Sequence, residues 1–266
     1  FDGAGVETIT IKGDVTTNGT NDFTLTEGTS LGVKTLNIGL SSNTEIKFAA
    51  NNWDALTKFD ASGSTGNITA DLSVATTAGK LLKTVVGGTG GDVFTVDVGN
   101  GVAAVNVNTG AGNDVLTLKA SATIADADAT ITLGAGKDTL TIGAAGGLAN
   151  ITATPTTVAE LTAKIVTVTD FKAAEDVLSI KAATPVVFDA AQVALIAGQA
   201  DLLAATKKAA ELAGTRKTVV FGFGTDSYIY QNDGDAAVDG GDGLVKLTGV
   251  NVNDFNSAFN GNLVVA

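Results

Sequence analysis

The chain contains no cysteine, no methionine and no histidine. Without cysteine it forms no disulfide and offers no thiolate nucleophile or metal ligand. Without histidine it lacks the imidazole base of a Ser-His-Asp triad and the ligands of an HExxH zinc site, which excludes two common hydrolase chemistries. No apolar run reaches the roughly 18 residues that a membrane-spanning helix needs, so we expect no membrane span.

Positive charge is also scarce, because Arg216 is the single arginine and the net charge is −12. Nucleic-acid binding needs clustered positive charge to neutralise phosphates, so we expect no nucleic-acid partner. The acidic residues are mostly aspartate, which favours turns and ligands of hard cations over helix surfaces. The plain alternative is that acidity only keeps the chain soluble.

What the sequence does have is glycine, 33 residues in all, and three similar glycine-rich turns at 87–92, 110–114 and 134–138. Each turn runs into a short stretch of alternating apolar residues, which predicts a strand with one buried face. These strands are expected at 93–96, 115–118 and 139–142. The first turn matches the nonapeptide G-G-x-G-x-D-x-U-x, which is read as a calcium-binding turn of a parallel β-roll.

The aspartates that end the turns, Asp92, Asp114 and Asp138, are 22 and 24 residues apart. Each interval holds two strand-like runs with a second turn between them, as at Asn100-Gly101. One period is therefore turn, strand, turn, strand, which is one coil of a parallel β-solenoid. Because coils stack about 4.8 Å apart, the three aspartates are predicted to lie above one another.

A column of stacked carboxylates is unfavourable by itself, and a cation between successive turns would relieve the repulsion. Glycine permits positive φ and lets backbone carbonyls point inward. Ca²⁺ takes about six to eight oxygens from carbonyls and carboxylates, so one turn supplies about half a shell and its neighbour the rest. We therefore predict bound Ca²⁺; the alternative is an ordinary glycine-rich corner with an aspartate cap.

Weaker copies of the turn lie upstream of these three, and acidic loops lie downstream. Upstream, Asn67 and Glu7 are predicted to occupy the aspartate position of the turns 62–67 and 2–7. Downstream, Asp170 and Asp176 bracket a loop and are candidates for a further ion, although a solvated turn explains them equally well. The acidic loop 232–242 lacks the EF-hand pattern and is predicted to be a hairpin tip.

The character of the sequence changes after Leu148, so we expect two regions. Residues 1–150 are predicted to form the solenoid, and residues 151–266 a smaller β-rich domain with one or two helices. Asp189 and Gly214 are the predicted N-cap and stop of a helix over 189–213, interrupted at Gly198, which packs on the neighbouring sheet or binds a partner. Further strands are expected at 8–11, 23–25, 35–38, 45–48, 165–168, 177–180, 218–221, 228–230 and 244–247.

The chain resembles the secreted repeats-in-toxin (RTX) superfamily and, within it, bacterial surface-layer proteins exported by type I secretion. The resemblance rests on the three glycine turns and on four further stretches, 59–68, 168–171, 176–178 and 247–250. It implies that Asp92, Asp114 and Asp138 are calcium ligands and that the turn glycines shape carbonyl ligands. These glycines are Gly87, Gly88, Gly90, Gly110, Gly112, Gly134 and Gly136.

The resemblance also implies folding on calcium after export, an uncleaved C-terminal secretion signal and a self-assembled lattice on the cell surface. The chain begins at Phe1, so we expect it to be part of a longer protein whose other parts bind cell-surface polysaccharide or lipopolysaccharide. With one glycine turn per coil rather than one every nine residues, it departs from the toxin pattern and should hold a single column of ions.

Two other functions stay open on the sequence alone. The chain is an alternative candidate for the folding and secretion module of a large RTX adhesin, or for the calcium-roll tail of a secreted hydrolase. A solenoid can also be a polysaccharide lyase or glycosidase that uses paired carboxylates. Such sites usually add cationic residues for acidic sugars, so we expect this chain not to be an enzyme.

Overall fold

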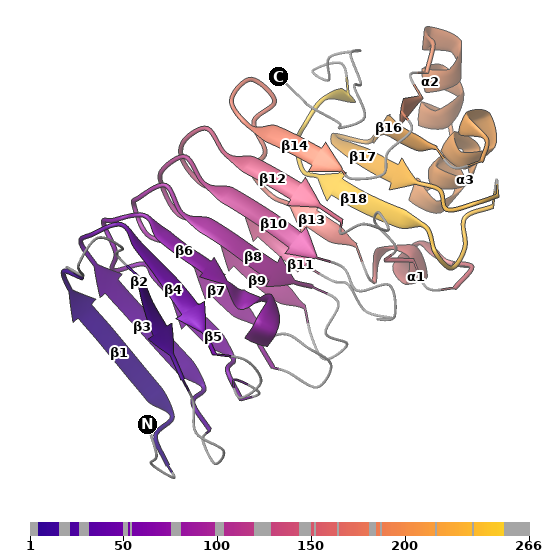
Figure 1. Ribbon diagram of the computed structural model, residues 1–266. Helices are drawn as coiled ribbons and strands as arrows, with labels where there is room; N and C mark the ends of the chain where they lie inside the picture. Colours follow the sequence, from indigo (N-terminus) through magenta and orange to yellow (C-terminus); the bar gives the residue numbers. More distant parts are fainter. Residues whose placement is uncertain are drawn as a thin grey trace.

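The computed structural model describes residues 5–15, 22–26, 32–49, 53, 55–75, 81–98, 104–119, 129–143, 150–151, 153–163, 165–180, 185–186, 188–215, 217–235 and 237–252. Within these residues the chain forms a parallel β-solenoid, followed by an antiparallel meander covered by helices (Figure 1). The predicted fold class, a mainly β solenoid with a few helices, is confirmed. The predicted turn at Asn100-Gly101 lies outside the described residues.

The solenoid has two parallel sheets, because successive strands of the chain alternate between them. The first sheet takes β1 (Thr8–Gly13), β3 (Thr35–Leu40), β5 (Lys58–Asp60), β7 (Thr84–Val86), β9 (Val105–Asn108), β11 (Ala129–Thr132) and β13 (Val166–Val168). The second takes β2 (Asp22–Leu25), β4 (Thr44–Phe48), β6 (Ile68–Asp71), β8 (Val93–Asp97), β10 (Val115–Lys119), β12 (Thr139–Ile142) and β14 (Val177–Ile180). From β3 to β14, each odd strand turns into the next even strand at the same edge of the stack (Figure 1).

The core lies between the two sheets and is built from the inward side chains of each strand. In the second sheet, one inward column stacks a residue from every strand in parallel register. Its members are Phe23, Ile46, Ala70, Phe94, Leu116, Leu140 and Leu178. Since a slip of one residue would turn all of these outward, the apolar alternation fixes the register and with it the alignment of the turns.

The first sheet continues beyond the solenoid, because β13 pairs with β18 (Gly243–Leu247) as well as with β11. It then runs through β17 (Asp226–Gln231), β16 (Thr218–Phe223) and β15 (Pro185–Val186). The strands β13 and β14, which the sequence assigned to the C-terminal region, pair with β11 and β12 as the last solenoid coil. Repeating structure therefore extends past residue 150, through an insertion that carries α1 (Val158–Thr162).

The predicted helix over 189–213 consists of two helices, α2 (Ala190–Ala197) and α3 (Leu202–Ala213). Gly198 caps the first, and Asp201 begins the second by accepting a hydrogen bond from Ala204 N at 2.8 Å. The helices contribute to a second core with the outer face of β16 and β17, so the prediction of packing on a sheet is confirmed. A short 3₁₀ helix (Leu72–Ala75) follows β6. No helix in the described part of the chain is both long and apolar enough to cross a membrane.

Candidate metal centre at the glycine turns

The glycine turns stack backbone against backbone. Ala111 N donates to Gly88 O at 2.9 Å, and Ala135 N donates to Gly110 O at 3.1 Å, so each turn is bonded to the one before it. Gly134 has a φ of +93°, and a Cβ placed there would lie 1.8 Å from Gly110 O. The glycines are thus required by close contact between turns as well as by backbone conformation. Their carbonyls accept hydrogen bonds from the neighbouring turn, and each still has a second lone pair.

A column of four buried aspartates runs beside these turns. The strand register aligns Asp92, Asp114, Asp138 and Asp176, the residues immediately before β8, β10, β12 and β14. Each is at most 2% exposed. In each, Oδ1 accepts a backbone N–H from the coil before it, donated by Ile68, Asp92, Asp114 and Asp138 at 2.7, 2.7, 2.9 and 3.0 Å respectively. The carboxylates therefore tie successive coils together.

The second oxygens of the column divide into two kinds. Asp92 Oδ2 accepts the Gly88 N–H at 2.7 Å, and Asp176 Oδ2 accepts the Lys172 N–H at 2.8 Å. Asp114 Oδ2 and Asp138 Oδ2 are buried and have no hydrogen-bond donor among the described residues. The Thr109 hydroxyl lies near Asp114 and acts to lower the pKa of that carboxyl. Its one proton, however, is donated to Leu133 O at 2.5 Å. The middle of the column thus holds two buried oxygens that no protein donor satisfies.

These surroundings disfavour the charged form of both carboxyl groups. Burial raises the pKa of Asp114 to about 6, against 3.8 for an ordinary aspartate, and the Asp92 N–H offsets only part of the rise. Burial likewise raises the pKa of Asp138 to about 6, and the charges of Asp114, Asp176 and Asp170 add to the rise. A cation beside these oxygens would remove the penalty, because an opposite charge favours the ionised form.

The donor set fits a hard cation such as Ca²⁺. The two unsatisfied carboxylate oxygens and the carbonyls of the adjoining glycine turns are oxygen ligands of the kind that calcium takes. Asp114 and Asp138 each bring an oxygen with both lone pairs open to the ion, whereas each oxygen of Asp92 and Asp176 already accepts one backbone N–H and has only its second lone pair left. The bound ion would supply positive charge between two coils and perform no bond chemistry.

Two of the predicted ligands lie beside the column rather than in it. Asp170 caps the preceding turn, since its two oxygens accept the N–H groups of Leu133 and Gly134 at 2.8 and 2.7 Å. Asn67 is one residue out of register: Asp92 aligns with Ile68, and Asn67 aligns with Gly91. The prediction that Asn67 takes the aspartate position is wrong, because strand pairing rather than turn sequence sets the alignment.

Glu7 lies at a different strand boundary, and the prediction that it occupies the aspartate position is also wrong. It precedes β1, which belongs to the first sheet, whereas the column precedes strands of the second sheet. Its carboxylate is exposed and forms an ion pair with Lys34 on the next coil. The segment 2–7 resembles the glycine turns in composition, but Glu7 leads into a strand of the first sheet and not of the second.

An asparagine ladder, which the sequence analysis missed, runs one residue before the aspartates. Asn43 Oδ1 accepts the Asn67 N–H at 2.9 Å, Asn67 Oδ1 accepts the Gly91 N–H at 2.8 Å, and Asn113 Oδ1 accepts the Lys137 N–H at 2.8 Å. Here each side chain reaches the following coil, in the direction opposite to the aspartates. The sequence signal that could have revealed this ladder is an Asn or Asp that recurs just before the strands of the second sheet.

The acidic loop between β17 and β18 is a hairpin connection, as the sequence predicted. Asp242 closes it by accepting the N–H groups of Asp233 and Asp239, each at 3.0 Å, and the Tyr230 hydroxyl at 2.5 Å. Among the described residues, only Asp233, Asp239 and Asp242 bring three acidic ligand atoms within 4.8 Å of one another. Both oxygens of Asp242 therefore have protein donors, and the hydrogen bonds within the loop explain the position of this carboxylate without a metal ion.

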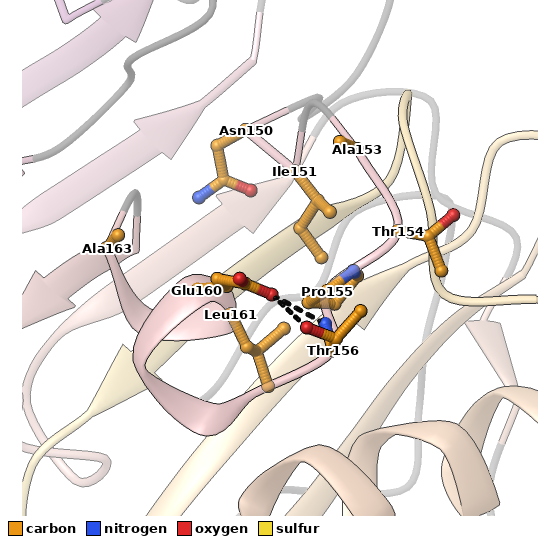
Figure 2. A pocket seen from close by; sticks show the side chains of 9 residues that line it. All are labelled: Asn150, Ile151, Ala153, Thr154, Pro155, Thr156, Glu160, Leu161 and Ala163. Atoms are coloured by element: carbon orange, nitrogen blue, oxygen red, sulfur yellow. Dashed lines mark hydrogen bonds between the residues drawn. The ribbon is translucent and has the colours of Figure 1, made fainter.

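A cavity of about 350 Å³ lies beside α1 and is lined by residues between 150 and 163 (Figure 2). Its two main polar side chains serve the fold. Asn150 spans Leu244, donating to its carbonyl at 2.8 Å and accepting its N–H at 2.7 Å. Glu160 accepts hydrogen bonds from Thr156 and Thr157 in the capping box of α1. The other lining residues are two threonines, Thr154 and Thr156, and five apolar residues, Ile151, Ala153, Pro155, Leu161 and Ala163.

Comparison of the chain with protein-family models finds no match, and comparison with curated proteins also finds none. The fold defines the class, a parallel β-solenoid with stacked glycine turns. Within this fold, the buried aspartate column is the feature whose chemistry bears on function.

Proposed function

We propose that this chain is a structural protein of the bacterial cell exterior, a calcium-stabilised β-solenoid that assembles with copies of itself in a surface layer. The observation that carries the proposal is the pair of buried, unsatisfied oxygens on Asp114 and Asp138. A calcium ion between the turns would supply the missing partner for both. The resemblance to exported RTX surface-layer proteins supports the assembly and the location.

Metal binding and folding are coupled in this proposal. The ligands come together only when the coils stack, so an ion that binds them stabilises the folded chain over the unfolded one. Outside the cell, where millimolar Ca²⁺ is common, even a modest affinity would keep the solenoid folded. Inside the cell, low calcium would leave the chain less stable and so easier to export in an unfolded form.

Thermal melting followed by circular dichroism tests the calcium step. The wild-type chain should melt at a higher temperature in millimolar Ca²⁺ than in excess chelator, and Mg²⁺ should have a smaller effect because it prefers a tighter octahedral shell. Asp138→Asn should lose most of the calcium response. Asp22→Asn is the matched control, since Asp22 lies on the outer face in an ion pair with Lys47 and should leave the response intact.

Equal responses in Asp138→Asn and Asp22→Asn would remove the column as the binding site. Assembly is tested separately, by electron microscopy of the purified chain and of any longer parent protein in millimolar Ca²⁺. Ordered sheets that disperse in chelator are the expected result. Absence of ordered assembly from both would refute the surface-layer role while leaving calcium binding to stand on the melting data.

A further inference from the structure

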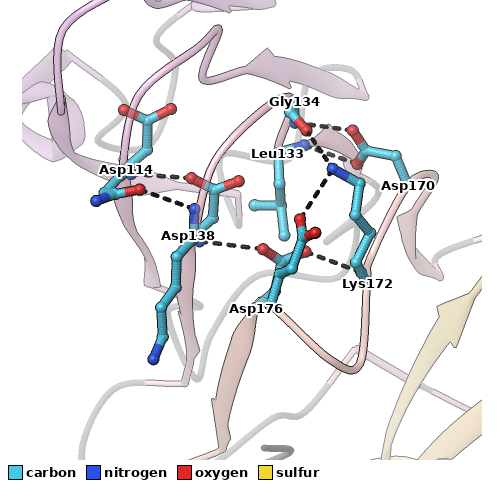
Figure 3. Close-up of polar contacts among 10 residues, drawn as sticks. Asp114, Leu133, Gly134, Asp138, Asp170, Lys172 and Asp176 are labelled. Atoms are coloured by element: carbon cyan, nitrogen blue, oxygen red, sulfur yellow. Dashed lines mark hydrogen bonds and ion pairs between the residues drawn. The ribbon is translucent and has the colours of Figure 1, made fainter.

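The turn that ends the solenoid differs from the glycine turns stacked beneath it. It spans residues 169–176, is longer than the turn 133–138 before it, and contains no glycine. It instead carries Lys172 opposite the last interval of the aspartate column (Figure 3). This turn therefore introduces a fixed positive charge at the point where the stack of glycine turns ends.

Lys172 is bound to the column through both its backbone and its side chain. Its N–H donates to Asp176 Oδ2 at 2.8 Å. Its ammonium donates to Gly134 O at 3.5 Å and to Glu175 Oε2 at 3.3 Å. Glu175 first, and then the charges of Asp176 and Asp170, raise the pKa of the ammonium. The side chain thus reaches back across the gap between two coils, as Figure 3 shows.

The ammonium contacts a carbonyl of the kind that the turns offer to a cation. Within the stack, the corresponding carbonyls of Gly88 and Gly110 accept N–H groups from the following turn. At Gly134 the donor is the Lys172 ammonium. The same interval contains the carboxylate of Asp176, which is 2% exposed and accepts the Asp138 N–H at 3.0 Å, and Asp170 also bonds across it to the turn before. A positive charge in this interval would offset the nearby carboxylates, and the Lys172 ammonium supplies one.

We propose that Lys172 is a tethered counter-ion that takes the place of a divalent cation in the last interval, between the turns 133–138 and 169–176. The ammonium neutralises this end of the column without metal. Ion binding is then confined to the intervals between glycine turns, above all that of Asp114 and Asp138. The confinement of ions rests on the proposed function, whereas the counter-ion role of Lys172 is testable in metal-free protein.

Three variants separate this role from an ordinary surface lysine. Lys172→Gln removes the charge but keeps a polar side chain. Lys137→Gln is the matched control, because it removes a lysine from the preceding turn at an exposed position. Glu175→Gln breaks the pair with Lys172 and leaves the ammonium in place. All three sites are on the surface, and circular dichroism in high Ca²⁺ checks that each variant folds.

Melting temperature in chelator and calcium titration by calorimetry are the readouts. We expect Lys172→Gln to melt several degrees lower than Lys137→Gln in chelator. We also expect it to gain one calcium site, or at least a tenfold increase in calcium affinity, relative to wild type. Lys137→Gln and Glu175→Gln should bind calcium as the wild type does.

The proposal is overturned if Lys172→Gln melts like Lys137→Gln in chelator, or if it gains no calcium binding. The wild-type titration is read independently. Gain of calcium binding by Lys172→Gln alone, with no binding by wild type, would uphold the counter-ion role and refute calcium stabilisation of the natural chain. Calcium binding by wild type with no change in Lys172→Gln would do the reverse.

Discussion

The two buried carboxyl groups at the centre of the column predict that the free energy of unfolding depends on pH in an unusual way. The pKa values of Asp114 and Asp138 are raised to about 6, chiefly by burial, against an ordinary 3.8. Between these values the folded chain holds protons that the unfolded chain has lost. In metal-free protein the free energy of unfolding should therefore fall as pH rises from about 4 to about 6 and level off above, by roughly 3 kcal/mol per group at about 1.4 kcal/mol per pKa unit.

Asp114→Asn isolates one of these contributions. The amide oxygen can still accept the Asp92 N–H, which Asp114 Oδ1 accepts at 2.7 Å, while the buried charge is removed. In chelator at about pH 7.5 this variant should be more stable than wild type by up to about 3 kcal/mol, and at about pH 4 the two should be nearly equal. With Ca²⁺ the order should reverse, because the ion stabilises only the charged carboxylate of the wild type.

Urea unfolding followed by circular dichroism at the two pH values, with and without chelator, measures these differences. Asp22→Asn is again the control and should change stability by less than about 1 kcal/mol, as expected for an exposed ion pair. Asp242, whose pKa burial also raises to about 6, acts in the same direction and stays constant between the variants. A metal-free wild type that is equally stable at both pH values, or an Asp114→Asn variant that is less stable at about pH 7.5, would refute the reasoning.

Two further substitutions test the stacking of the turns by chemical denaturation. Gly134→Ala should destabilise the chain by several kcal/mol, since its Cβ would lie 1.8 Å from Gly110 O. Gly224→Ala is the control: this glycine also has a positive φ, but nothing lies within 4 Å of the added Cβ, so the substitution should cost only about 1 kcal/mol. Equal costs would mean that φ alone explains the glycines. Asn67→Ala should cost about 1 to 2 kcal/mol by removing the acceptor of the Gly91 N–H, and an unchanged unfolding midpoint would exclude the asparagine ladder as a stabilising element.

Much of the fold follows from local pattern. Strict apolar alternation predicted strands such as 139–142 and 177–180 with the bounds that the structure has. The helix prediction over 189–213 was right in place and in its interruption at Gly198, but it missed Asp201, the N-cap at which the second helix begins. The helix α1 was missed, since its five residues are too few for a periodic signal.

The candidate site was predictable only in part. The aspartates of the three glycine turns were found from the repeat, and the structure aligns them in one column with Asp176. Asn67 and Glu7 were misplaced because turn composition does not state which strand follows in which sheet. The asymmetry between Asp92, whose oxygens are both satisfied, and Asp114, whose Oδ2 is not, depends on which backbone N–H groups reach each carboxylate.

The sequence by itself determined the repeating unit, because glycine turns and apolar alternation are local properties that need no knowledge of distant residues. Only the tertiary structure decided which residues of different coils lie next to one another. Stacking of coils in parallel register brought aspartates from separate repeats together, left two of their oxygens buried without a donor, and set Lys172 across the final gap. These are contacts between coils, and their register follows from how apolar side chains of successive strands pack inside the solenoid.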